Sequence, residues 1–63
     1  MMVVDKAGNE VKTGDIVWGK KSYIFLQCDG HRIEVKTTDD RRMFMWLEPQ
    51  HLNLTIEASH AET

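Results

Sequence analysis

Apolar and polar residues alternate with a period of two along much of this chain, which is the pattern of half-buried β-strands. The longest such stretch covers residues 22–37 and is divided by Asp29-Gly30. Asp-Gly between two strand-forming runs is the strongest short-range signal for a two-residue type I′ turn, because both turn residues need positive φ. The sequence therefore predicts a β-hairpin over 22–37 with its turn at Asp29-Gly30.

The predicted turn decides which side chains share a face of the hairpin, because its length fixes the register of the two strands. The pairs expected on the core side are Cys28 with His31, Leu26 with Ile33, and Ile24 with Val35. Tyr23 and Phe25 lie on the opposite side in this register, so we expect both rings to face outward.

Shorter apolar runs flank the hairpin and are separated by turn residues such as Gly, Asp and Asn. The further strands that these runs predict cover residues 2–4, 10–11, 16–18, 42–47 and 53–56. We expect 10–11 to pair back onto 2–4 as a small ribbon. Pro49 has no amide hydrogen for a central strand, so 48–52 is predicted to form a single 3₁₀ turn.

Short strands separated by turns every several residues are typical of a small barrel or of two packed sheets. A 3₁₀ turn directly before the last strand narrows this prediction to an all-β, SH3-like barrel of about five strands. We expect one domain over 1–56 and a disordered tail over 57–63. A chain of 63 residues buries a limited core, so a partner or a second copy would add stability.

The opening of the chain resembles that of several families of small SH3-like barrels. It follows the pattern Asp5-x-x-Gly8-x-x-Val11-x-x-Gly14-Asp15-x-Val17. The pattern resembles KOW-type domains of transcription and ribosomal proteins, and the opening of YopX-like proteins of phages and prophages. Residues 47–52 look like the 3₁₀ turn of the same architecture. The resemblance implies a barrel. The resemblance to KOW-type domains in particular implies binding to nucleic acid or ribosomal partners.

Charge argues against a typical nucleic-acid binder. The formal net charge is −2, and residues 1–56 hold all eight Lys and Arg together with eight of the ten Asp and Glu, so this part is neutral. Nucleic-acid binders draw affinity from a basic excess that this chain lacks. Basic residues set among aromatic ones still support an RNA- or DNA-binding alternative. Its candidate residues are Lys20, Lys21, Arg32, Lys36, Arg41 and Arg42.

Cys28 is the only cysteine, which excludes a disulfide framework and favours a reducing compartment. No apolar run is long enough for a membrane span or a signal-peptide core. We therefore expect a cytoplasmic protein that does not act at a membrane.

Cys28 and His31 are the residues to consider for a metal site or a nucleophilic pair. A structural zinc site needs four ligands, and nothing in the sequence places His51 or His60 near them. The chain has no phosphate loop, no Ser-His-Asp arrangement and no cofactor fingerprint. We predict no enzymatic activity, with no catalytic residues, no metal ligands and no cofactor.

The aromatic residues carry the preferred functional hypothesis. All five are candidates for protein binding: Trp18, Tyr23, Phe25, Phe44 and Trp46. The register of 43–47 is open, because either Phe44 and Trp46 or Met43 and Met45 could face the core. Several outward aromatic rings on one small domain mark a binding site. The alternative is that a bent sheet buries some of them under the N-terminal ribbon.

The sequence thus predicts a non-enzymatic binding module. The preferred version is a small phage- or prophage-encoded adaptor or inhibitor that docks a protein partner, or a second copy of itself, through an aromatic face.

Overall fold

A computed structural model describes residues 2–57, and within this range the only helix is one 3₁₀ turn. The elements in chain order are β1 (Met2–Val4), β2 (Ile16–Trp18), β3 (Ser22–Cys28), β4 (Ile33–Thr37), β5 (Phe44–Leu47), η1 (Pro49–Leu52) and β6 (Thr55–Glu57). The predicted all-β class and the 3₁₀ turn directly before the last strand are confirmed. Glu57 ends β6, and the rest of the expected tail, 58–63, lies outside the described residues.

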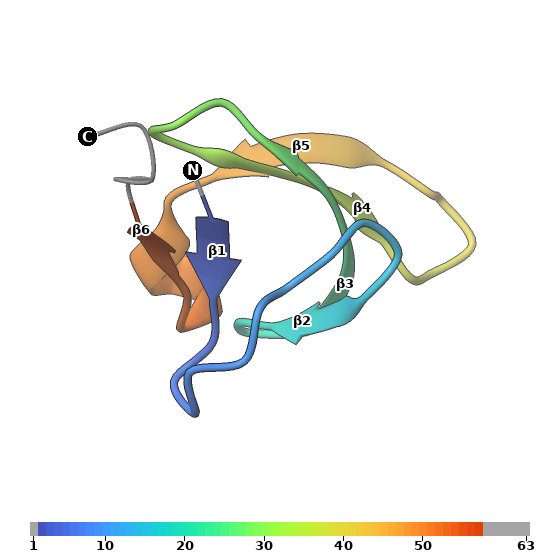
Figure 1. The fold of residues 1–63 in the computed structure, drawn as a ribbon. Coiled ribbons are helices and arrows are strands. Elements are labelled where there is room, and N and C mark those ends of the chain that lie inside the picture. The colour runs from blue at the N-terminus through green and yellow to red at the C-terminus, as the bar shows by residue number, and fades with distance from the viewer. Residues whose placement is uncertain (1, 58–63) are drawn as a thin grey trace.

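The strands form two antiparallel sheets. Strands β2, β3, β4 and β5 follow one another in a four-stranded sheet, whereas β1 pairs with β6. Figure 1 shows the larger sheet curling around an interior, with β1 and β6 side by side at its open side. The ribbon expected between 2–4 and 10–11 is reduced to one bridge between Val4 and Glu10 and a 2.8 Å bond from the Val11 N–H to the Val3 carbonyl.

The core lies inside this curl and is built from β1 to β4, η1 and the residue before β6, with Met45 and Leu47 of β5 partly buried against it. Its buried apolar members are Val3, Val4, Val17, Tyr23, Phe25, Ile33, Val35, Leu52 and Leu54. Ile33 and Val35 have no exposed surface, which confirms their predicted place in the core. Leu52 and Leu54 come from η1 and the residue before β6, so the 3₁₀ turn closes the open side of the sheet.

The predicted two-residue turn at Asp29-Gly30 is wrong. Cys28 pairs with Ile33 instead of His31, so four residues connect the two strands. Of the two residues predicted to have positive φ, only Gly30 has it, at 99°. The connection is therefore a wider loop than the Asp-Gly signal indicates.

The Asp29 side chain explains the wider loop. Its carboxylate accepts hydrogen bonds from the backbone N–H of Arg32 at 2.7 Å and of His31 at 2.8 Å. The carboxylate thereby takes the place of the Asp29 carbonyl as acceptor of the Arg32 N–H, while the Asp29 N–H still donates to the Arg32 carbonyl at 3.1 Å.

A β-bulge at Leu26 changes the register a second time. Gln27 faces Glu34, but Phe25 faces Val35, so Leu26 is an extra residue in β3. Relative to the predicted register, the wider loop shifts the β3–β4 pairing by two residues, and the bulge shifts it by one residue in the opposite direction. The net shift of one residue exchanges the two faces of the strand beyond the bulge.

This shift overturns the predicted orientation of the β3 side chains. Tyr23 and Phe25, expected to face outward, are buried in the core with 7% and 5% of their surface exposed. Ile24, expected to line the core, is half-buried and pairs with the exposed Ile16. The bulge therefore decides which aromatic residues the fold leaves in solvent.

The turn at 12–15 holds the bulge in place from across the sheet. The Thr13 hydroxyl donates to the Leu26 carbonyl at 2.7 Å, and the Gly14 N–H donates to the Phe25 carbonyl at 2.8 Å. Gly14 has φ 98°, which a residue with a side chain would adopt only with strain. The carbonyl of the bulged residue thus has a partner outside the β3–β4 ladder.

Thr37, at the end of β4, fixes the position of β5. Only 3% of this residue is exposed, and its hydroxyl donates to the Asp39 carboxylate and accepts from the Met43 N–H, both at 2.9 Å. The Thr37 N–H also donates to the Met43 carbonyl at 2.9 Å. These bonds close the connection so that Phe44 lies opposite Lys36. The open question about residues 43–47 is thereby answered: Phe44 and Trp46 face outward.

We expect Thr37→Val to lower the free energy of unfolding by about 1–3 kcal/mol, because an isosteric methyl neither donates to Asp39 nor accepts from the Met43 amide. Urea denaturation measures the change. Thr55→Val at an exposed position of β6 is the control, with an expected loss of about 0.5 kcal/mol or less. Equal denaturation midpoints for the two variants would contradict the role given to Thr37.

Candidate functional site

The outer side of the four-stranded sheet carries four of the six large apolar side chains that the described residues leave exposed, the other two being Met2 and Met43. Partners in an antiparallel ladder point to the same face, so the register defines rows of neighbours across the sheet. One row crosses all four strands and consists of Ile16, Ile24, Lys36 and Phe44. A second row consists of Gln27, Glu34 and Trp46, and a third begins with Trp18 and Ser22.

Four members of these rows are strongly exposed, and we call them the outer apolar face: Ile16 (51%), Trp18 (63%), Phe44 (63%) and Trp46 (41%). Ile16 and Trp18 come from β2, whereas Phe44 and Trp46 come from β5. With strands about 4.8 Å apart, three inter-strand steps place the two pairs about 14 Å from each other along the sheet.

Three of the five aromatic residues that the sequence proposed for binding lie on the outer side of the sheet, Phe44 and Trp46 at its β5 edge and Trp18 at its β2 edge. Trp18, Phe44 and Trp46 share the outer face, whereas Tyr23 and Phe25 are core residues. Ile16 was not among the sequence candidates. Alternation around the buried Val17 is the signal that places Ile16 on the same side as Trp18.

Charged and polar groups lie between the two apolar pairs. The ammonium of Lys36 is 5.9 Å from the centre of the Phe44 ring, within the range of a cation–π interaction. The Gln27 side-chain amide donates to the Glu34 carboxylate at 2.7 Å. The outer face therefore has apolar margins on β2 and β5 and a polar centre with both signs of charge.

The basic residues considered for nucleic acid are spread over three places. The β2–β3 and β4–β5 connections lie at one end of the sheet, where the hydroxyl oxygens of Ser22 and Thr38 are 2.9 Å apart. These two connections contribute Lys20, Lys21, Arg41 and Arg42. Lys36 lies within the outer face, and Arg32 lies in the loop at the opposite end of β4.

Two aspartates in the connections have lowered pKa values. The Thr37 hydroxyl holds the pKa of the Asp39 carboxyl below its ordinary value of 3.8, and the backbone N–H of Arg41 and the charge of Lys21 act in the same direction. The backbone N–H groups of Arg32 and His31 likewise hold the pKa of Asp29 below 3.8. Both carboxylates are ionised near neutral pH, so Asp39 places negative charge among the basic residues of its end of the sheet.

The Cys28 and His31 pair that the sequence brought to attention does not form across the hairpin. Cys28 faces Ile33, and its sulfur accepts a hydrogen bond from the Gly30 N–H at 3.3 Å. Between residues 2 and 57 no three His, Cys, Asp or Glu side chains are grouped so as to hold a metal ion. The same part of the chain contains no helix that is long and apolar enough to cross a membrane.

We expect the free energy of unfolding to fall as the pH drops below 3.8, the ordinary aspartate pKa, through the lower folded-state values of Asp29 and Asp39. Unfolded aspartates take up protons first, and protonation of the folded carboxylates weakens the bonds that they accept. Urea denaturation at a series of pH values from about 5 to 2 measures this decline.

Asp29→Asn is the matched variant, since the amide oxygen still accepts hydrogen bonds but the side chain does not titrate. The free energy of unfolding of this variant should decline less between about pH 5 and pH 2 than that of the natural chain. Parallel declines would show that Asp29 contributes nothing to the acid sensitivity.

Comparison of the chain with protein-family models, with curated proteins and with solved structures finds no match. Two features of the surface bear on function. The outer apolar face bears on protein binding, and the basic residues at one end of the sheet bear on nucleic-acid binding.

Proposed function

We propose that this protein acts by binding another protein through its outer apolar face. The observation that carries the proposal is the exposure of two tryptophans and a phenylalanine on one side of one sheet, at 63% for Trp18, 63% for Phe44 and 41% for Trp46. Aromatic side chains are enriched at interfaces and dominate their energetics. Exposed apolar residues gathered on one face mark such surfaces, whereas single ones do not.

The strands that present these side chains are fixed before a partner arrives. Trp46 and Phe44 lie on β5, whose pairing with β4 is set by the bonds around Thr37, and Trp18 lies on β2 in register with Ser22. A preorganised aromatic surface loses little conformational entropy on binding. The polar centre around Lys36 adds hydrogen-bonding groups that restrict which partners fit.

Because the sheet curls and β2 and β5 are its two edges, the partner that fits is a protein surface with an apolar patch for Phe44 and Trp46 on β5. A second copy of the chain is the simplest occupant of the same face. The resemblance of the opening residues to YopX-like proteins supports a phage- or prophage-encoded adaptor or inhibitor that works in the cytoplasm. The resemblance to SH3-like barrels fits such a role, because these barrels often serve as binding modules.

Nucleic-acid binding is the second candidate, favoured by one observation. The bond between Ser22 and Thr38 brings the β2–β3 and β4–β5 connections to one end of the sheet, with two basic residues on each. Asp39 and Asp40 lie in the same β4–β5 connection and reduce the local positive charge. Affinity that falls steeply with salt and with Arg41→Ala would support this candidate over the first.

We expect Phe44→Ala and Trp46→Ala to retain the fold but weaken partner binding about 30-fold or more, as the loss of a hot-spot aromatic residue does. The tagged protein is used to capture partners from a bacterial lysate, with and without nuclease, and the affinity for the recovered partner is then measured. Light scattering on a sizing column tests whether the partner is a second copy. Circular dichroism checks that each variant is folded.

Gln50→Ala, at an exposed position on η1 away from the outer face, is the control and should bind normally. Phe25→Ala, which empties a core position, should instead cost about 3–5 kcal/mol of stability. Undiminished binding by the folded Phe44 and Trp46 variants would refute the proposal. Recovery that disappears with nuclease would favour the nucleic-acid candidate.

A further inference from the structure

β2 (Ile16–Trp18) is an edge strand with one open side. It pairs with β3, and no other strand of the described range 2–57 pairs with it. The Phe25 N–H donates to the Asp15 carbonyl at 2.8 Å, so the backbone of Asp15 points toward β3. Backbone direction alternates along a strand, so Val17 also points toward β3 while Ile16 and Trp18 point their N–H and C=O groups away from it.

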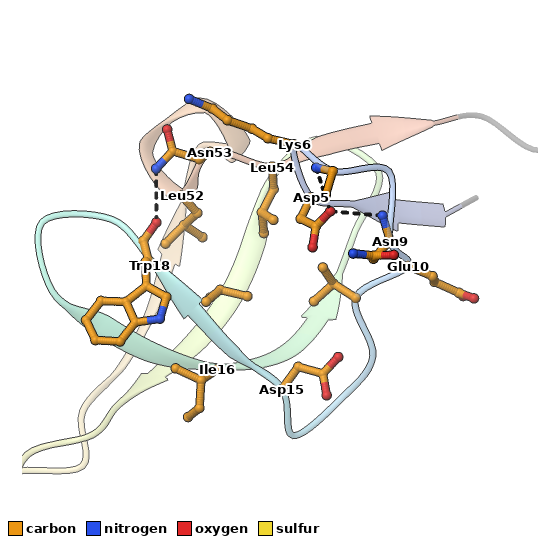
Figure 2. A pocket seen from close by; sticks show the side chains of 13 residues that line it. Asp5, Lys6, Asn9, Glu10, Asp15, Ile16, Trp18, Leu52, Asn53 and Leu54 are labelled. Carbon is orange, nitrogen blue, oxygen red and sulfur yellow. Dashed lines mark hydrogen bonds between the residues drawn. The ribbon is translucent and has the colours of Figure 1, made fainter.

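The Trp18 carbonyl confirms this alternation. It accepts a hydrogen bond from the Asn53 side-chain amide at 3.3 Å, on the side of β2 that faces away from β3 (Figure 2). The N–H and C=O of Ile16 and the N–H of Trp18 are the remaining groups on this side. They form a short donor–acceptor–donor series along the strand, which is what an added strand pairs with.

These groups open onto a cleft of about 670 Å³. Figure 2 shows β2 as one wall, the turn that carries Asp5 and Glu10 as the other, and Leu52 and Leu54 between them. The volume lies within the roughly 300–1,000 Å³ typical of ligand-binding clefts. An extended segment placed beside β2 would therefore meet apolar side chains as well as backbone groups.

The charged side chains of the cleft are mostly acidic. Asp5, Glu10 and Asp15 line it, against the single amine of Lys6. The Asp5 carboxylate accepts hydrogen bonds from the Ala7 and Asn9 N–H groups at 2.9 Å, so its position is fixed by its own turn. A negative wall attracts a cationic segment and disfavours a second copy of the same edge, because two copies would bring like charges together.

We propose that the open edge of β2 binds an extended basic segment of a partner protein as an added strand. The segment donates to the Ile16 carbonyl and accepts from the N–H groups of Ile16 and Trp18. Its apolar residues lie against Val11 and Trp18, which line the cleft and keep exposed surface, and its Lys or Arg residues lie near Asp5 and Glu10. This site is held by backbone groups, so it stands whether or not the outer apolar face binds a partner.

Amide hydrogen exchange followed by NMR tests the open edge in the protein alone. The amides of Ile16 and Trp18 should exchange at least about tenfold faster than that of Val17, which points into the sheet. Similar protection of all three amides would show that the edge is already occupied, and it would overturn the proposal.

The binding probe is an acetylated six-residue peptide of alternating valine and lysine. At saturation it should protect the Ile16 and Trp18 amides about tenfold or more. A peptide with glutamate in place of lysine should bind at least about fivefold more weakly, and one with alternate backbone nitrogens methylated should not bind. Asp5→Asn and Glu10→Gln should each weaken binding about two- to fivefold, as exposed ion pairs do.

Ile16→Pro removes one donor of the open edge, and proline is tolerated where the N–H does not enter a ladder. Ile16→Ala is its matched control, since it shortens the side chain but keeps the N–H. The proline variant should lose at least about tenfold more affinity for the peptide than the alanine variant. Equal affinities would overturn the proposal. If the proline variant does not fold, the methylated peptide decides the same question.

Two further results would also overturn the proposed β2-edge site. One is no binding of the lysine peptide at about 1 mM, and the other is peptide-induced changes in NMR chemical shift that are confined to Phe44 and Trp46. Phe44→Ala should leave the peptide affinity unchanged. Failure at the β2 edge is thereby distinguished from failure of the outer apolar face.

Discussion

The extra residue at Leu26 is the constraint on which the rest of this structure depends. Because the bulge shifts the β3–β4 pairing, Phe25 lies opposite Val35 and both side chains enter the core. Without it, the same strand would turn Ile24 inward and leave an aromatic ring in water. A bulge also increases the local twist and bend of its strand, which agrees with the strong curl of the sheet in Figure 1.

The bulge also determines what the outer side of the sheet can present. With Tyr23 and Phe25 buried, the exposed aromatic residues are left to β2 and β5, at the two edges of the four-stranded sheet. Thr37 completes the arrangement because its hydrogen bonds to the Met43 backbone set where β5 begins. The distribution of exposed aromatic side chains is thus a consequence of two register-determining features, one in β3 and one after β4.

Sequence reasoning succeeds where the deciding interactions are local, and it fails where they are not. Alternation and turn residues place six strands and the 3₁₀ turn at Pro49, because these follow from backbone preferences of neighbouring residues, whereas the short strand expected at 10–11 is reduced to one bridge. The register of the hairpin depends on the Asp29 carboxylate and on a bond from Thr13 to Leu26, thirteen residues away. No periodicity in the sequence contains that contact, so alternation alone predicts the wrong faces for Tyr23 and Phe25.

β2 belongs to two surfaces at once because a strand directs its side chains and its backbone groups at right angles. The side chains of Ile16 and Trp18 extend the outer apolar face, while their backbone groups point along the sheet into the acidic cleft. A partner that followed the edge would therefore contact Ile16 and Trp18, the β2 part of the outer apolar face, and leave Phe44 and Trp46 on β5 accessible. Since three residues form this strand, a short segment is enough to cover the edge.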